Sequence, residues 1–285
     1  MCDYLLDMRQ GSRVSLATAP PAIKGHMFYR DDLQGPNFER YGTDLASGLQ
    51  TLLAHVNDPE PPMLYMEAVR LAECLPDFAA SNRLDLLDES IAPRIWIGNA
   101  VRVQTHYDLL SNIACVVAGR RRFTLFPPEQ LPNLYCGPPD MTPAGVPLSM
   151  VQLENPDFNR YPRFKQALEV AQVAELEPGD ALFIPYGWWH HVQSLAPFNV
   201  LVNYWWVSST TTSSPRDCLL HGVIALRDMQ PDERAVWKNL FDYYVFQTSG
   251  DPMAHLPLNF RGVMGSHSLE QIKNIKGTLA KALAK

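Results

Sequence analysis

The sequence lacks any apolar run long enough to cross a membrane. None of its uninterrupted apolar runs approaches the roughly 18–20 residues that a transmembrane helix requires. The first residues, MCDYLLDMRQGSR, also lack the basic start and the apolar stretch that are typical of a signal peptide. We therefore expect a cytoplasmic protein without membrane contact.

Cysteine is scarce and is not arranged for cross-linking. The chain of 285 residues contains 5 cysteines, an odd number, with wide spacings and no CxxC motif. Neither a disulfide framework nor a zinc ribbon follows from this pattern. A reducing compartment such as the cytoplasm favours cysteines of this kind.

A surplus of positive charge is also missing. The formal net charge is −6 and the sequence pI is about 5.7. A surface that follows nucleic-acid phosphates needs a basic stripe, and the dense basic cluster of this sequence is confined to Arg120–Arg122. We therefore do not expect a nucleic acid as the main partner.

What the sequence does have is a long β-rich segment. Hydrophobic residues make up 46% of the chain, which is ordinary for a globular protein with a core. Between residues 91 and 207, short stretches rich in β-branched and aromatic residues alternate with turns. These stretches predict strands at Ile95–Ile97, Val101–Asp108, Ile113–Val117, Arg122–Phe126, Val173–Glu177, Ala181–Pro185, His191–Leu195 and Val200–Val207. Many short strands of this kind favour a jelly roll, the double-stranded β-helix of cupins, over residues 91–210.

The segments on either side of this core have a different character. Residues 1–90 predict a flanking region packed on the core, irregular up to residue 40, with a helix at Thr43–Val56 and a strand at Met63–Val69. A proline-rich excursion at residues 129–165 interrupts the β pattern, and we expect it to cover one end of the sheet. Residues 211–285 predict a helical region.

The clearest helix of this last region is predicted at Ser268–Lys285. Ser268 and Gln271 have the spacing of a capping box. An apolar stripe follows, made of Leu269, Ile272, Ile275, Leu279 and Leu283. Such a stripe must be buried against something, and we expect a homodimer formed through the C-terminal helices.

A His-x-Asp pair, His106 and Asp108, lies in the centre of the β-rich segment. Residues i and i+2 of a strand project from the same face, so an imidazole and a carboxylate would converge. A third ligand could come from His190 or His191, only one of which can face the pair because adjacent strand residues alternate. Two histidines and one carboxylate form the facial triad of non-haem Fe(II) oxygenases. The pair by itself is weak evidence, since most HxD pairs are surface pairs or satisfied hydrogen bonds.

A cation for an acidic co-substrate is available nearby. Oxygenases with this triad usually need a co-substrate that supplies electrons, commonly 2-oxoglutarate, and its far carboxylate needs a cation in the pocket. Arginine suits this role because its planar fork binds carboxylates through two hydrogen bonds. Strand alternation places Arg121 on the opposite face from Arg120 and Arg122.

Taken together, these motifs resemble a known family, the JmjC (cupin-like) Fe(II)/2-oxoglutarate oxygenases. Within that family the chain is similar to the asparaginyl hydroxylase of hypoxia-inducible factor and its bacterial relatives. The match spans roughly residues 63–206 and is carried, in order, by MLYMEA at 63–68, HYD at 106–108, Asn112, GRRRFTLFPPEQ at 119–130, NPDFNRYPRF at 155–164, EPGDALFIPYGWWHHVQSL at 177–195 and VNYWW at 202–206.

The resemblance implies roles for individual residues. It implies His106, Asp108 and His190 as the catalytic iron ligands, because the first histidine of WWHH is the ligand in this family. It implies that the co-substrate 2-oxoglutarate is bound by Tyr65, Asn112, Arg121 and Asn203. Trp189 and Trp206 are expected in the wall of the pocket.

Two departures from the family pattern concern the co-substrate pocket. Arg121 stands where the asparaginyl hydroxylase has a lysine, which keeps the charge but lengthens the reach. Val103 stands where that enzyme has a threonine, and Thr105 is expected on the other face of the strand. Both changes affect the details of co-substrate binding rather than the identity of the co-substrate.

The sequence therefore predicts a 2-oxoglutarate-dependent dioxygenase. It would use Fe(II), 2-oxoglutarate and molecular oxygen to hydroxylate a protein or peptide side chain or a small molecule, and it would release succinate and CO2. The alternative is a metal-binding cupin without oxygenase activity, such as an isomerase or a binding protein. The sequence contains no motif that identifies the substrate.

Overall fold

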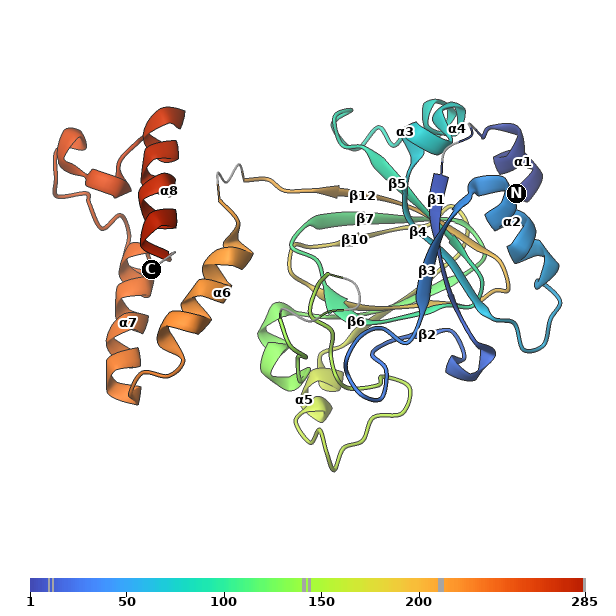
Figure 1. Cartoon of the computed structure of the whole chain (residues 1–285), viewed down its shortest axis with the longest axis horizontal. Coiled ribbons are helices and arrows are strands. Elements are labelled where there is room, and N and C mark those ends of the chain that lie inside the picture. The colour runs from blue at the N-terminus through green and yellow to red at the C-terminus, as the bar shows by residue number, and fades with distance from the viewer. Residues whose placement is uncertain (10, 12, 140–141, 143–144, 210–212, 284–285) are drawn as a thin grey trace. The chain divides into compact units, whose positions relative to one another are not determined.

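The chain divides after residue 208 in the computed structural model, which describes residues 1–9, 11, 13–139, 142, 145–209 and 213–283. The first unit, Met1–Ser208, carries the β-sheets, and the second, Ser209–Lys285, is helical (Figure 1). The protein is mainly β, as the sequence predicted, with a cupin-like pair of sheets and flanking helices. No helix among the described residues is long and apolar enough to span a membrane.

Two sheets build the first unit in the described part of the chain. The larger has seven strands in the order β10-β7-β12-β5-β4-β1-β3 and the smaller has five in the order β2-β6-β11-β8-β9. All neighbouring pairs are antiparallel except β2 and β6. The strands are β1 (Arg13–Ala19), β2 (His26–Met27), β3 (Glu39–Asp44), β4 (Met63–Arg70), β5 (Pro93–Gly98), β6 (Arg102–Tyr107), β7 (Ser111–Ala118), β8 (Arg121–Phe126), β9 (Gln172–Leu176), β10 (Ala181–Ile184), β11 (Trp189–Ser194) and β12 (Asn199–Trp206).

The N-terminal segment contributes strands to both sheets. The prediction that residues 1–40 are irregular was wrong, because β1 pairs with β3 and with β4. The alternating apolar residues of β1 are few, and its partners lie elsewhere in the chain, so the local pattern was weak. The predicted strand at Met63–Val69 is confirmed as β4.

Strand alternation on β12 divides the interior into two layers. Val200, Val202 and Tyr204 point into an apolar cluster on the outer side of the larger sheet. Leu201, the residue between them, joins a second cluster with residues of the smaller sheet, such as Phe123. The inner face of β12 therefore lies between the two sheets, which is where Asn203 and the residues beside it are positioned.

Helices cover the outer side of the larger sheet. They are α1 (Cys2–Asp7), α2 (Leu45–Ala54), α3 (Leu71–Cys74) and α4 (Pro76–Ser81). A 3-10 turn, η1 (Pro21–Ile23), follows β1, and its Ile23 packs in a different cluster. Helix α2 confirms the predicted helix and is capped by Asp44, whose carboxylate accepts a hydrogen bond from the Ser47 N–H at 2.9 Å. Its Leu45, Leu49 and Leu52 pack into the outer cluster.

The proline-rich excursion packs over one end of the smaller sheet, as predicted. It contains η2 (Pro128–Asn133) and α5 (Phe164–Glu169). Leu134, Val151 and Phe164 form an apolar cluster with Phe126 of β8 and Trp189 of β11.

The helical unit consists of α6 (Pro215–Leu226), α7 (Pro231–Tyr244) and α8 (Leu269–Leu283), with 3-10 turns η3 (Leu258–Phe260) and η4 (Gly262–Met264). The predicted capping box of α8 is present: the Ser268 N–H donates to Gln271 Oε1 at 2.8 Å, and the Gln271 N–H donates to Ser268 Oγ at 3.3 Å. Four residues of the predicted apolar stripe of α8 are exposed on this unit: Leu269, Ile275, Leu279 and Leu283.

Candidate metal centre and co-substrate cavity

A β-bulge in β6 turns His106 toward the space between the sheets. On β11, His190 pairs with His106 and Val192 pairs with Val103, so two residues of β6 oppose His191 alone. Without the extra residue, Val103 and His106 would face opposite sides, because their separation is odd. The bulge places both on the inner face, where they line one cavity.

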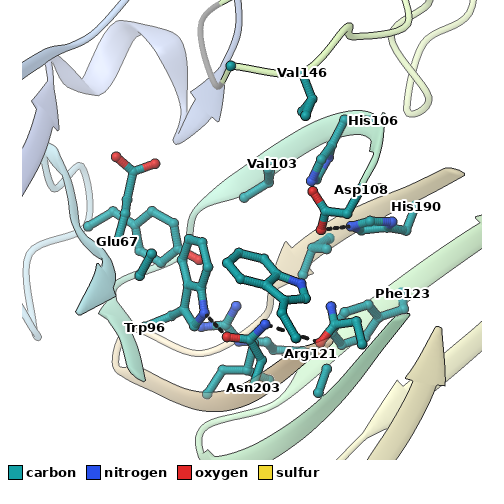
Figure 2. A pocket seen from close by; sticks show the side chains of 18 of the residues that line it. Glu67, Trp96, Val103, His106, Asp108, Arg121, Phe123, Val146, His190 and Asn203 are labelled. Atoms are coloured by element: carbon teal, nitrogen blue, oxygen red, sulfur yellow. Dashed lines mark hydrogen bonds and ion pairs between the residues drawn. The ribbon is translucent and has the colours of Figure 1, made fainter. Parts of the chain in front are cut away.

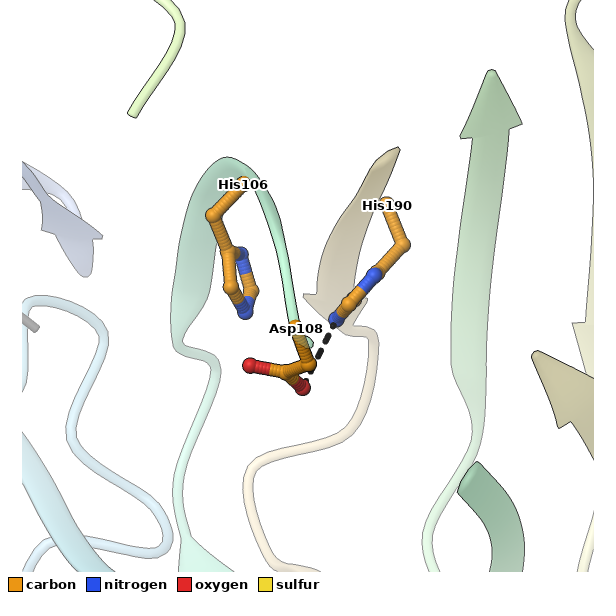
Figure 3. A group of neighbouring side chains, drawn as sticks. All are labelled: His106, Asp108 and His190. Atoms are coloured by element: carbon orange, nitrogen blue, oxygen red, sulfur yellow. Dashed lines mark ion pairs between the residues drawn. The ribbon is translucent and has the colours of Figure 1, made fainter. Parts of the chain in front are cut away.

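Three side chains from separate positions meet at this inner face. One nitrogen of His106, one nitrogen of His190 and one carboxylate oxygen of Asp108 all lie within 4.8 Å of one another. The two imidazole rings are 4.2 Å apart between centroids, and His190 Nε2 is 3.7 Å from Asp108 Oδ2. Figure 3 shows both rings turned toward the Asp108 carboxylate. The donor set is that of a facial triad.

Backbone carbonyls select the histidine nitrogens that can bind a metal. His106 Nδ1 lies 2.8 Å from the carbonyl oxygen of Gln104, and His190 Nδ1 lies 3.1 Å from that of Trp188. A carbonyl only accepts, so each Nδ1 must carry the proton and each Nε2 keeps its lone pair. Burial, followed by the proximity of His106, lowers the pKa of His190 to about 4, so this ring is neutral at pH 7.

The triad lines a cavity of about 570 Å³ between the two sheets. Figure 2 shows Glu67 and Trp96 on the opposite side of this cavity from His106, Asp108 and His190. Its volume is in the range of small-molecule sites, and it is lined by both apolar and polar side chains. The four residues expected to bind the co-substrate all line it: Tyr65, Asn112, Arg121 and Asn203.

Arg121 is buried in this cavity with unused donors. Only 1% of the residue is exposed, whereas its neighbour Arg122 is exposed and donates to Glu175 at 2.8 Å. Arg121 hydrogen-bonds Tyr65, whose pKa is raised by burial and drawn back by this arginine. Its Nε and Nη2 atoms are buried without a hydrogen-bond partner among the described residues. A buried guanidinium with free donors fits a carboxylate of a ligand.

The two asparagines belong to one chain of hydrogen bonds. The Trp96 indole N–H donates to Asn203 Oδ1 at 2.7 Å. Asn203 Nδ2 in turn donates to Asn112 Oδ1 at 3.1 Å. Asn203 is 2% exposed and Asn112 is 6% exposed, so both amides are held in place by their partners.

A second bulge shapes the rim of the cavity. The pairing of β4 with β5 shifts between Met66 and Val69, and Ala68 adopts a left-handed backbone with φ 48°. Such a conformation is strained for alanine and often re-aims a side chain beside a functional site. Glu67 lies in this bulge and lines the cavity, where it accepts a hydrogen bond from Arg40 Nε at 2.7 Å.

His191 faces away from the triad, as the alternation predicted. It is 2% exposed, and its Nε2 lies 3.0 Å from Glu154 Oε1. Its Nδ1 lies 3.4 Å from Thr105 Oγ1, which confirms that Thr105 is on the face opposite Val103. Burial raises the pKa of Glu154, but the hydrogen bond and charge of His191, with a smaller effect of Arg102, outweigh it and lower that pKa to about 2.

The aromatic wall differs from the expectation. Trp189 packs against Tyr107 in the cluster under the excursion, and Trp206 stacks on Phe183, so neither is among the residues that line the cavity. The lining tryptophans are Trp96 and Trp205. Strand alternation from Asn203 would have pointed to Trp205, two residues further on. The cavity is also lined by Trp96, Arg40 and Glu67, and no local pattern in the sequence predicted this.

Comparison with known proteins supplies the family context. A family model described as "Cupin-like domain" matches residues 1–212. Lysine-specific demethylase JMJ31 of Arabidopsis thaliana is 35% identical over 161 residues, which are 56% of this chain and 28% of that protein. HSPB1-associated protein 1 of Rattus norvegicus is 37% identical over 119 residues, 39% of this chain and 23% of that protein. tRNA wybutosine-synthesizing protein 5 of Gallus gallus is 37% identical over 106 residues, 37% of this chain and 30% of that protein. The chain thus spans less than a third of the length of these relatives.

Proposed function

The chain belongs to the cupin-like (JmjC) domain family, and we propose that it is an Fe(II)- and 2-oxoglutarate-dependent oxygenase, like the oxygenases of that family. It hydroxylates a protein side chain or a small molecule and releases succinate and CO2. Of these two substrate classes, the analogy with a relative named as a lysine-specific demethylase favours a protein or peptide.

One observation carries the proposal: a single cavity holds a facial triad together with a buried arginine that has unused donors. In the ladder between β8 and β11, Arg121 of β8 pairs with Ser194, and Leu125 of β8 pairs with the triad residue His190. Arg121 is therefore four residues along β8 from the position opposite His190. That is about 13 Å between backbones. A long arginine side chain and a five-carbon diacid together can bridge this distance.

The residues present fit Fe(II) and a keto-diacid. His106 Nε2, His190 Nε2 and an Asp108 oxygen would hold the ion on one face and leave the other positions free for ligands. Arg121 would take the far carboxylate through its two free donors, and Tyr65 would keep the guanidinium aligned. Bound iron, 2-oxoglutarate and oxygen would supply the oxidising chemistry. Val103, Trp96 and the other apolar lining residues exclude water from the reacting atoms.

The first test is metal-dependent turnover of the co-substrate. With Fe(II) and oxygen, the protein should convert 2-oxoglutarate to succinate, and Asp108→Ala should reduce this by at least about 100-fold, because the triad loses its only charged ligand. Succinate is measured by mass spectrometry. Asp157→Ala, at a turn outside the cavity, should keep the wild-type rate.

A second test concerns Arg121, and the neighbouring Arg122 provides the control. Arg121→Gln should raise the KM for 2-oxoglutarate by roughly 100-fold, because a buried charged hydrogen bond is lost. Arg122→Gln removes only the exposed pair with Glu175 and should leave KM unchanged. If the wild type binds iron but neither binds nor consumes 2-oxoglutarate, the protein is a metal-binding cupin without oxygenase activity.

We further propose that the protein is a homodimer formed through its C-terminal helices. None of the described residues of α6, α7 or α8 is buried within this unit. Large apolar side chains are exposed there on all three helices: Leu219, Ile224, Val236, Trp237, Leu279 and Leu283. An apolar surface of this kind supports a partner contact.

A further inference from the structure

The cavity contains a carboxylate that the proposed function does not use. Among the described residues, the acidic side chains that line the cavity are Asp108 and Glu67, and Asp108 belongs to the triad. The Glu67 side chain is only 18% exposed, and it lies across the cavity from the triad (Figure 2). A substrate that enters this cavity therefore meets a negatively charged acceptor on the side opposite the metal ligands.

The bulge in β4 places Glu67 beside an aromatic ring. The register between β4 and β5 skips two residues, Glu67 and Ala68, which together lie opposite Trp96. Ala68 has the left-handed backbone described above, and its carbonyl oxygen accepts a hydrogen bond from Arg94 Nη1 of β5 at 3.3 Å. Strained backbone of this kind is concentrated at active sites and ligand-binding segments. The position of Glu67 next to Trp96 therefore points to a ligand.

Arg40 shows that Glu67 can bind a cation. Arg40 Nε donates to Glu67 Oε2 at 2.7 Å, and Arg40 Nη2 donates to Oε1 at 3.4 Å. The Arg40 side chain is 38% exposed, so this ion pair is screened by water and contributes little free energy. A carboxylate has about four acceptor positions, and these two hydrogen bonds use only two of them. Glu67 can therefore accept hydrogen bonds from a second cation.

Aromatic rings continue from Glu67 along the wall of the cavity. The ring centroids of Trp96 and Tyr65 are 5.9 Å apart, and Trp96 contacts Trp205 edge to face with centroids 5.6 Å apart. All three rings line the cavity. Aromatic faces attract cations, and apolar surface packs well against the aliphatic stem of a long charged side chain. A carboxylate beside such rings suits a side chain with an apolar stem and a positive end.

We infer that Glu67 and Trp96 form a subsite for a positively charged side chain, arginine or lysine, of a polypeptide substrate. The inference rests on the proposed function and specifies the substrate of the same cavity. With its charged end at Glu67, such a side chain extends its stem across the cavity toward the triad (Figure 2). An acidic side chain is repelled by Glu67, and a neutral one gains only a weaker hydrogen bond.

The first measurement uses the wild-type protein loaded with Mn(II) and 2-oxoglutarate. The probes are terminally blocked peptides Gly-Gly-Xaa-Gly-Gly in which Xaa is arginine, citrulline, lysine, acetyl-lysine or glutamate. Citrulline and acetyl-lysine keep the stem and a polar end but carry no charge. The Kd of each peptide is measured by ligand-observed NMR. The arginine or the lysine peptide should bind at least about 10-fold more tightly than its neutral counterpart, as for a hydrogen bond between charged groups.

Two variants separate recognition from a structural role. Glu67→Gln removes the negative charge, so the preference for the charged peptide should fall to within about twofold. Arg40→Gln breaks the same ion pair from its other side but keeps the carboxylate, so the preference should be kept or should increase. If Glu67 served only to hold Arg40 in place, the two variants would change peptide binding equally.

The outcomes separate this inference from the proposed function. If the metal-loaded wild type does not bind 2-oxoglutarate, the proposed function fails. If it binds 2-oxoglutarate but does not prefer a charged peptide over its neutral counterpart, or prefers the glutamate peptide, the proposed function stands and the cationic subsite is rejected. A preference that survives in Glu67→Gln, or that is lost equally in both variants, also rejects the subsite.

Discussion

At the scale of single residues, two neighbouring histidines differ in which of their nitrogens is already occupied. His190 donates a hydrogen bond from Nδ1 to a backbone carbonyl, so the lone pair of its Nε2 is available on the side of Asp108. His191 uses Nε2 for Glu154 and Nδ1 for Thr105, so it has no lone pair left for an ion. The side-chain partners, rather than the residue type, decide which histidine can be a ligand.

Glu154 makes a pH-dependent contribution to stability. Its pKa in the folded protein is about 2, below the ordinary 4.5, so the ionised form stabilises the fold at pH values above about 4.5. That stabilisation is lost as the pH falls from 4.5 toward 2. Glu154→Gln should therefore lower the free energy of unfolding at pH 7 by up to about 1 kcal/mol, a modest value because the side chain is 31% exposed.

The measurement is urea unfolding of both proteins at pH 7 and at pH 3. The difference between Glu154→Gln and wild type should shrink at the lower pH, and Glu129→Gln, an exposed glutamate, should show no difference at either pH. A difference that grows as the pH falls would contradict the assignment.

At the scale of elements, bulges in two strands direct side chains into the cavity. The bulge in β6 brings Val103 and His106 to one face, and the bulge in β4 carries Glu67 to the rim. Simple alternation along β6 would have turned either Val103 or His106 outward. The sequence predicted both strands correctly but contained no sign of the extra residues, because a bulge depends on the partner strand.

The backbone strain in the β4 bulge can be measured by an alanine-to-glycine substitution there and by the same substitution in an unstrained strand. Ala68 has a left-handed backbone, which costs a residue with a Cβ atom about 1–2 kcal/mol, and glycine avoids this at an entropic cost of about 0.5–1 kcal/mol. Ala68→Gly should therefore raise the free energy of unfolding by up to about 1 kcal/mol. Ala17→Gly, in the buried strand β1, should lower it, since there glycine only adds flexibility and removes a packed methyl.

Both variants are compared with wild type by urea unfolding, with m-values checked for a common transition. If Ala68→Gly destabilises as much as Ala17→Gly, the bulge is not strained.

At the scale of the whole molecule, the two units differ in how they bury apolar surface. The first unit encloses several apolar clusters, whereas the described helices of the second unit expose most of their large apolar side chains. Its capping signals were visible in the sequence because they are local, and α8 formed where the stripe predicted it. A second copy of the chain would cover this stripe in a dimer, and the dimer stays a prediction.

Leu279→Glu tests that prediction. Leu279 of α8 is 56% exposed, and a dimer contact there would bury the new carboxylate, which is energetically unfavourable. The variant should therefore be monomeric, as measured by light scattering after size-exclusion chromatography. Leu86→Glu makes the same change at a leucine that is 81% exposed in the first unit and should leave the wild-type mass unchanged. A wild type that is monomeric at all concentrations would refute the dimer.

The local properties of this chain were readable from its sequence. Strand alternation separated Arg121 from Arg122. The His106–Asp108 pair and the Ser268–Gln271 capping box of α8 each involve residues only two or three positions apart. Tertiary structure alone decided that β1 joins the larger sheet and that Trp96 and Trp205 line the cavity, whereas His190 was already implied by the family resemblance and left open only by strand alternation. These features arise from pairing between strands that are distant in the chain, and the bulges that adjust their register leave no periodic signal in the sequence.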